Sequence, residues 1–249
     1  MIVQKEVWKR IPLLHVYNEQ MTSESPVVIF IHGFNSAKEH NLHYAYQLAE
    51  KGVRVILPDT YLHGERKENY SDMQMELAFW KIVIKTVAEV NTIFQELHLK
   101  NILTTNNIGL AGTSMGGIVT SGCLKIYDWV KTAGICMGTV SYTKFAQYQL
   151  EQFEKDGLDF PMTEKERNDI FSMLKQYDLE DKQNILNSVP IMFWHGKQDT
   201  VVPFAMTHPY FEEHGENSCS TYIVDEKAGH VVSREGMLAV TDWLVQHLA

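Results

Sequence analysis

Two patterns of apolar residues alternate along the chain. Short runs of consecutive apolar residues, rich in Val and Ile, are typical of strands buried on both faces of a parallel sheet. Apolar residues recurring every three or four positions indicate amphipathic helices, and the longest such segment, 71–98, opens with a candidate capping box at Ser71 and Gln74. We expect strands at 2–9, 12–18, 26–31, 53–57, 107–111, 133–137, 189–194 and 220–225, and helices at 39–51, 71–98, 117–127, 204–214 and 234–248.

The order of these elements predicts an α/β fold, with a mostly parallel central sheet flanked by helices on both faces. One segment breaks the alternation. Residues 141–185 carry 10 acidic and 6 basic residues in 45, with helical spacing and no convincing strand. We expect 1–140 and 186–249 to form the core domain, and 141–185 to be a helical cap inserted into it. A solvated helical excursion without a role at the site is the simpler alternative.

A GxSxG motif, formed by Gly112, Ser114 and Gly116, stands between a predicted strand and a predicted helix. A serine on a sharp strand-to-helix turn has a strained backbone, and glycines two positions to either side let the chain double back. The helix that follows points its N–H groups at any anion that forms there. This context favours Ser114 as a nucleophile, and an inert serine in a tight turn is the alternative.

A serine hydroxyl needs a base that removes its proton, and the base needs an acceptor that fixes its tautomer. His230 follows the last predicted strand between small residues, so it should reach the sheet edge where Ser114 lies. Asp199 follows another predicted strand at the same edge and is the expected acceptor. Asp225, the competing carboxylate, is better explained as the end of a strand or the cap of the next turn.

Acyl transfer also needs N–H donors aimed at the oxyanion that forms during the reaction. The backbone N–H of Met115, directly after the nucleophile, is one candidate. The loop after the strand at 26–31 offers the other, because Gly33 permits a close approach of backbone to substrate and is followed by the N–H of Phe34. His32 and Gly33 are therefore candidate substrate contacts as well.

Four motifs together carry a resemblance to known proteins: HGF at 32–34, GTSMGG at 112–117, WHGKQDTVVP at 194–203 and AGH at 228–230. From residue 26 onward the chain resembles the α/β-hydrolase superfamily, whose triad follows the same Ser, Asp, His order. It is most similar to small bacterial carboxylesterases of the YitV- and YjfP-like kind, in the branch related to dienelactone hydrolases and prolyl oligopeptidases. Dienelactone hydrolases use a cysteine nucleophile, so Ser114 argues against that activity, and no segment predicts the propeller domain of prolyl oligopeptidases.

A polar loop follows the predicted strand at 53–57. It contains Asp59, His63 and Arg66, and we expect hydrogen bonds and an ion pair among them to hold the loop together. Contact of Arg66 with an anionic group of the substrate is the alternative.

Three aromatic residues of the predicted cap are further candidate substrate contacts. Phe145, Tyr148 and Phe171 lie on the apolar stripes of its helices. Both ends of the cap should lie at the sheet edge where open α/β sheets bind ligands. We therefore expect these rings to cover the pocket.

Composition and charge limit the classes of molecule that the protein is expected to bind. The net charge of −9 and the absence of a basic block argue against nucleic acid, and no window of 18 apolar residues predicts a membrane span. The N-terminus lacks the apolar stretch of a signal peptide, and three cysteines without CxxC spacing indicate reduced thiols, so we expect a cytoplasmic protein. His40 and His43 lack a third ligand, which argues against a metal site.

These observations predict a serine carboxylesterase that cleaves small-molecule esters through an acyl-enzyme, without cofactor or metal. A peptidase or thioesterase would use the same triad, because pocket shape selects the acyl and leaving groups. A hydrolase-fold protein that binds a ligand without turning it over is a rival from another class. A homodimer is left open.

Overall fold

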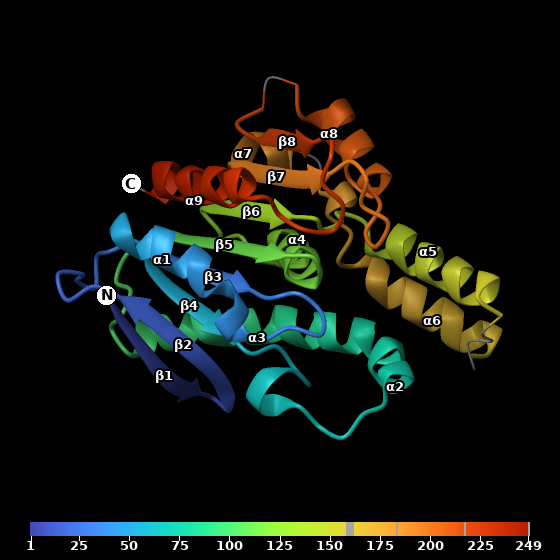
Figure 1. The fold of residues 1–249 in the computed structure, drawn as a ribbon, viewed down its shortest axis with the longest axis horizontal. Coiled ribbons are helices and arrows are strands. Elements are labelled where there is room, and N and C mark those ends of the chain that lie inside the picture. The colour runs from blue at the N-terminus through green and yellow to red at the C-terminus, as the bar shows by residue number, and fades with distance from the viewer. Residues whose placement is uncertain (158–161, 183, 217, 249) are drawn as a thin grey trace.

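The computed structural model describes residues 1–157, 162–182, 184–216 and 218–248 (Figure 1). These residues contain one eight-stranded sheet in the order β1-β2-β4-β3-β5-β6-β7-β8. β2 pairs antiparallel with β1 and with β4, and the other neighbouring strands are parallel. The strands are β1 (Ile2–Trp8), β2 (Ile11–Tyr17), β3 (Val27–Ile31), β4 (Arg54–Pro58), β5 (Ile108–Thr113), β6 (Thr132–Cys136), β7 (Ile191–Gly196) and β8 (Thr221–Asp225).

The central strands are largely apolar because both of their faces are covered. Every residue of β3, β4, β6 and β7 is buried. Successive side chains of a strand point to opposite faces, so Ile29 joins one apolar core and Phe30 the other. α3 (Phe79–Leu99) and α4 (Met115–Ile126) cover the first core, and α1 (Leu42–Glu50) and α9 (Arg234–Leu248) cover the second. The predicted helices on both faces are therefore present.

The predicted helix at 71–98 is wrong in one respect, because the chain forms two helices there. α2 (Asp72–Leu77) begins with the predicted capping box, in which the Ser71 side chain accepts from the Gln74 amide and the Gln74 side chain accepts from the Ser71 amide. α3 starts after Ala78 and takes another direction (Figure 1). α2 buries none of its side chains, whereas α3 packs along the sheet, so only the second helix is held in line by the core.

Residues 141–185 leave the sheet after β6 and return to it before β7. α5 (Tyr142–Lys155) and α6 (Glu164–Lys175) lie beside each other and project beyond the edge of the sheet (Figure 1). One carboxylate fastens their base: Asp178 accepts hydrogen bonds from the amides of Tyr142 and Thr143 and from the Thr143 hydroxyl. Asp178 therefore ties the start of α5 to the chain just after α6, and η3 and α7 then lead back to the amino end of β7, which is parallel to β6.

The other helical turns are short. The predicted helices near 39–51 and 204–214 both begin with a single 3₁₀ turn. No helix in the described part of the chain is both long and apolar enough to cross a membrane. The remaining elements are η1 (Lys38–Asn41), η2 (Gly64–Arg66), η3 (Leu179–Asp181), α7 (Ile185–Ser188), η4 (Phe204–Met206) and α8 (His208–His214).

Candidate active site

Ser114 lies at the sharp turn between β5 and α4. Its backbone has φ 55° and ψ −120°, a conformation that costs free energy for any residue with a Cβ. The glycines on either side make the turn sterically feasible: a Cβ on Gly112 would overlap the backbone of Gly116, and a Cβ on Gly116 would overlap the carbonyl of Ile31. The fold thus holds the Ser114 hydroxyl on a tight, strained bend at the carboxyl edge of the sheet.

The structure brings the three predicted triad residues together from distant parts of the chain. The Ser114 Oγ lies 2.7 Å from His230 Nε2, so the hydroxyl donates to the imidazole. On the other side of the ring, His230 Nδ1 lies 2.7 Å from Asp199 Oδ2 and donates to it. The three side chains form a continuous chain of hydrogen bonds in the geometry that nucleophile activation requires.

Asp199 is held as a carboxylate. Its side chain is buried, and its other oxygen, Oδ1, accepts from the amides of Val201 at 2.9 Å and Val202 at 3.0 Å. Burial alone would raise the pKa of Asp199. Hydrogen bonds from His195 and His230 outweigh burial and hold that pKa well below its usual range. A permanently charged acceptor therefore faces His230.

Asp225 serves another purpose. It ends β8, and its Oδ1 accepts from the amides of Lys227 at 3.1 Å and Ala228 at 3.0 Å. These bonds shape the turn that leads to His230. This is the turn-capping role expected from the sequence, and the carboxylate hydrogen-bonded to His230 is that of Asp199.

Two histidines brace the loop that carries Phe34. His32 Nδ1 donates to the Gly33 carbonyl at 2.8 Å, and its Nε2 accepts from the Thr60 amide at 3.1 Å. On the other side, His63 Nε2 accepts from the Asn35 amide at 3.0 Å. His32 is fully buried and both ring nitrogens are occupied, so its interpretation as a substrate contact is wrong. It fixes the loop instead.

Gly33 lies beside the nucleophile. A Cβ on Gly33 would lie 3.4 Å from the Cβ of Ser114, an ordinary van der Waals contact, so the loop is a close neighbour of the turn. The next amide, that of Phe34, makes no hydrogen bond to any described residue. Met115 is the first residue of α4, so its amide has no partner within the helix.

Burial of His32 makes the stability of the fold depend on pH. Burial, above all, lowers the pKa of His32 from its usual 6.5 to about 4. The unfolded chain therefore binds this proton near pH 6.5 and the folded chain only near pH 4. We expect His32 to lower the free energy of unfolding, by on the order of 3 kcal/mol, as the pH falls through this window.

Urea denaturation at several pH values between 7 and 4 measures this effect. In His32→Asn the loss of stability between those pH values should be smaller than in the parent protein. The exposed His214, changed to Asn, is the matched control and should leave the slope unaltered. An equal slope in all three proteins would show that other groups carry the pH dependence.

The polar loop after β4 contains an expected hydrogen bond, but its ion pairs are not those expected. Arg66 does not pair with Asp59: its guanidinium makes a bidentate ion pair with Glu89 of α3, at 2.6 and 2.7 Å, and one nitrogen also donates to the Asp59 carbonyl. The Asp59 carboxylate pairs with the buried ammonium of Lys38 at 2.6 Å. Arg66 is thus committed to the protein and does not line the cavity at Ser114.

A cavity of about 440 Å³ opens at the nucleophile. Phe34, Phe79 and Ile118 line it from the core, and α5 forms the opposite wall with Phe145 and Tyr148 among its residues. Phe171 lines neighbouring cavities and not this one. The first two cap aromatics therefore lie where the sequence predicted, and the third does not.

Several lining residues were missed from the sequence. Gln149 and Gln152 of α5 line the same cavity, because each lies four residues after Phe145 or Tyr148 and shares their helix face. Asp156, at the end of α5, lines it as well. Polar side chains on an otherwise apolar stripe were the available signal. Glu76 and Val201 also line it, from α2 and from the loop after β7, and no local pattern indicates them.

Metal binding finds no support in the geometry. Over the residues that the structure describes, no group of three His, Cys, Asp or Glu side chains could hold a metal ion. His40 Nδ1 lies 2.9 Å from the Ser36 hydroxyl, which accounts for one of its ring nitrogens.

Comparison with known proteins decides the family. The model described as "Prolyl oligopeptidase family" matches residues 39–249, most of the chain. The chain belongs to the prolyl oligopeptidase family. This family member is 36% identical to YitV of Bacillus subtilis (strain 168) over 252 residues, 99% of each chain. It is 27% identical to YjfP of Escherichia coli (strain K12) over 242 residues, 96% of each chain. Both relatives carry the word esterase in their names, so the predicted resemblance to small bacterial esterases is confirmed.

Solved structures show the same fold. TT1662 from Thermus thermophilus superposes on this prolyl oligopeptidase family member with a TM-score of 0.75 at 19% identity, covering 100% of this chain and 99% of that one. With the sheet order and the helices on both faces, this likeness confirms the predicted α/β-hydrolase fold.

Proposed function

We propose that the protein is a serine esterase that cleaves small carboxylic esters through an acyl-enzyme. The observation that carries the proposal is the hydrogen-bonded chain from Ser114 through His230 to Asp199, whose nucleophile lines a cavity. The names of the relatives YitV and YjfP, which both contain the word esterase, support cleavage of esters over cleavage of amides or thioesters.

In the first step, Ser114 Oγ attacks the carbonyl carbon of the ester while its proton passes to His230 Nε2. Asp199 stabilises the imidazolium that forms and keeps the ring oriented. The carbonyl oxygen becomes an oxyanion. When the tetrahedral intermediate collapses, the alcohol leaves with the proton from His230, and the acyl group remains on Ser114.

In the second step, water replaces the alcohol. His230 removes a proton from the water, the hydroxide attacks the acyl carbon, and collapse returns the proton to Ser114 Oγ. The product is the free carboxylic acid. No group beyond the triad and the oxyanion donors takes part in this sequence.

We assign the oxyanion to the amides of Phe34 and Met115. Both amides lack partners in the described part of the chain, and they follow Gly33 and Ser114, which are neighbours at the bend. The N-terminus of α4 adds its positive dipole end at the same place. In a subtilisin, loss of one such donor costs about 10² to 10³ in turnover.

The reaction class is tested with the purified protein and three substrate series: aryl esters, aryl thioesters and aminoacyl amides. We expect kcat/KM to be highest for the esters. A fluorophosphonate probe, followed by intact-protein mass, separates an active enzyme from a protein that only binds a ligand. Preferred cleavage of amides or thioesters would replace the ester assignment, and an unlabelled protein would remove the catalytic one.

We also propose that 141–185 is a cap that shapes the substrate pocket of a core formed by 1–140 and 186–249. Support comes from α5, which supplies a wall of the cavity at Ser114. Tyr148 spans from this wall to the core, because its hydroxyl donates to the Thr200 carbonyl at 3.2 Å.

Replacing Tyr148 with alanine should therefore change selectivity more than stability. Removal of a half-buried ring enlarges the cavity, and we expect kcat/KM for p-nitrophenyl hexanoate relative to acetate to rise by about tenfold. The melting temperature should change by less than about 4 °C. Phe145→Ala is the contrast, because its ring is buried against Phe79 and Trp80 and its loss costs about 3–5 kcal/mol. If Tyr148→Ala leaves the hexanoate-to-acetate ratio unchanged and causes a large loss of stability, α5 is part of the hydrophobic core and does not select the substrate.

A further inference from the structure

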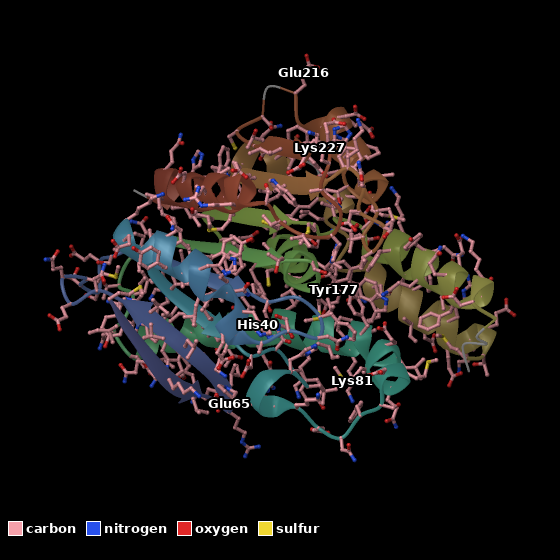
Figure 2. The ribbon with its side chains drawn as sticks, in the orientation of Figure 1. His40, Glu65, Lys81, Tyr177, Glu216 and Lys227 are labelled. Carbon is pink, nitrogen blue, oxygen red and sulfur yellow. The ribbon has the colours of Figure 1, made fainter. Side chains whose placement is uncertain are left out.

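A second cavity adjoins the one that contains Ser114. It has a volume of about 520 Å³ and lies between α2 and α3 on one side and α5 and α6 on the other (Figure 1). Lys81 of α3 and Tyr177, just after α6, line it and are labelled in Figure 2. The volume falls within the range of about 300 to 1,000 Å³ that is typical of small-molecule sites.

The wall of this second cavity is dominated by apolar side chains from four helices. Leu77, at 39% exposed, and Met173, at 38% exposed, are among the large apolar residues that the fold leaves open to solvent. Apolar area that stays in contact with water loses about 25 cal/mol of stabilisation per Å². Others that line the cavity are Trp80, Ile84, Leu150, Phe153, Ile170 and Phe171.

The two cavities share part of their walls. Glu76, Gln149 and Phe153 line both of them, so the cavities meet at these side chains. At the Ser114 end the neighbours include polar groups such as Gln152 and Thr200. Beyond the shared wall, apolar side chains dominate. This polarity gradient matches a molecule with a polar reacting group at one end and a long apolar chain at the other.

We propose that the second cavity binds the distal part of a long unbranched apolar chain whose ester group is bound at Ser114. This inference rests on the proposed function and names its substrate class, medium- to long-chain aliphatic esters. The chain passes the shared wall of Glu76, Gln149 and Phe153 and packs between α3 and the α5–α6 pair. It also gives Phe171 a role, because that ring lines the second cavity.

Ala88 offers a way to fill the second cavity without touching the first. It lines only the second cavity and is exposed on α3, so a larger side chain there overlaps no buried neighbour. Gln95 is exposed on the same helix, two turns further along, and lines neither cavity. Ala88→Trp and Gln95→Trp are therefore a matched pair.

The test compares kcat/KM for a long and a short substrate in each variant. p-Nitrophenyl decanoate against acetate probes a long acyl chain, and decyl acetate against ethyl acetate probes a long alcohol. In at least one arm, Ala88→Trp should lower the long-to-short ratio by about tenfold or more while short-chain turnover stays unchanged. Gln95→Trp should match the parent protein. Unchanged long-to-short ratios in both arms overturn the proposal. If Ala88→Trp leaves the ratios unchanged but alters the oligomeric state, the cavity is a contact between copies of the chain and the proposal is likewise overturned.

A binding measurement separates this proposal from the proposed function. Calorimetric titration of Ser114→Ala with decanoic acid needs no turnover. Binding that is weakened about tenfold or more by adding Ala88→Trp supports the chain site even if the protein cleaves no ester. Absence of binding, in a protein that does cleave p-nitrophenyl acetate, leaves the esterase intact and overturns the chain site.

Discussion

Ser114→Ala is expected to reduce turnover of p-nitrophenyl butyrate by a factor on the order of 10⁶, the loss seen when a triad nucleophile is removed from a subtilisin. The remaining site still has His230, Asp199 and the oxyanion amides, but no oxygen in position to attack. Alanine preserves the Cβ at the strained bend, so the melting temperature should stay close to that of the parent. Initial rates and thermal denaturation of both proteins measure the two effects.

A matched control is Ser188→Ala, which removes an exposed hydroxyl at the end of α7. It should retain full activity. Hydrolysis by Ser114→Ala above a few per cent of the parent rate would show that another group attacks the ester. A fluorophosphonate adduct on Ser114→Ala, located by peptide mass, would identify that group.

Asp199→Asn is expected to lower turnover by about 10⁴, because an amide nitrogen facing His230 Nδ1 stabilises the wrong imidazole tautomer. In the parent protein, Asp199 Oδ2 accepts the proton of that nitrogen. The variant keeps an acceptor for the Val201 and Val202 amides, so the loop should retain its shape. Steady-state kinetics at pH 8 measure the loss.

The competing carboxylate provides the control for this prediction. Asp225→Asn keeps an oxygen that accepts from the Lys227 and Ala228 amides, so most of the activity should remain. If Asp225→Asn were the impaired enzyme and Asp199→Asn the active one, the assignment of the acid would be reversed.

The sheet and the position of Ser114 could be predicted because the signals are local. Strands such as β3 and β7 are buried on both faces, and this leaves an unbroken apolar run in the sequence. Gly112 and Gly116 stand two positions to either side of Ser114 because a larger residue would not fit the bend. This steric requirement produces a recognisable pattern within five consecutive residues. His230 and Asp199 followed from one rule, that strand ends of a parallel sheet meet at one edge.

The parts that could not be predicted depend on contacts between distant segments. The sequence grouped Arg66 with Asp59 and His63, but its ion-pair partner Glu89 lies in α3, on a face that only the packing of that helix defines. The sequence does not predict that His32 is buried and unable to contact substrate, because its partner Thr60 lies in a different segment, the loop after β4. The second cavity lies among four helices. It could not be predicted, because the spacing of apolar residues within one helix does not give the distance of that helix from another.

The attachment at Asp178 makes the α5–α6 segment a module. This one side chain bonds the start of α5 from a position just after α6, so the two ends of the helix pair meet there. Further along, Phe145 packs on Phe79 and the Tyr148 hydroxyl donates to the Thr200 carbonyl, so the first half of α5 is also held against the core. We expect insertions and deletions at the far end of the pair, beyond these contacts, to leave the bend at Ser114 and the loop of Asp199 unchanged. If so, substrate range would diverge through changes in chain length between α5 and α6, while the reacting groups are inherited unchanged.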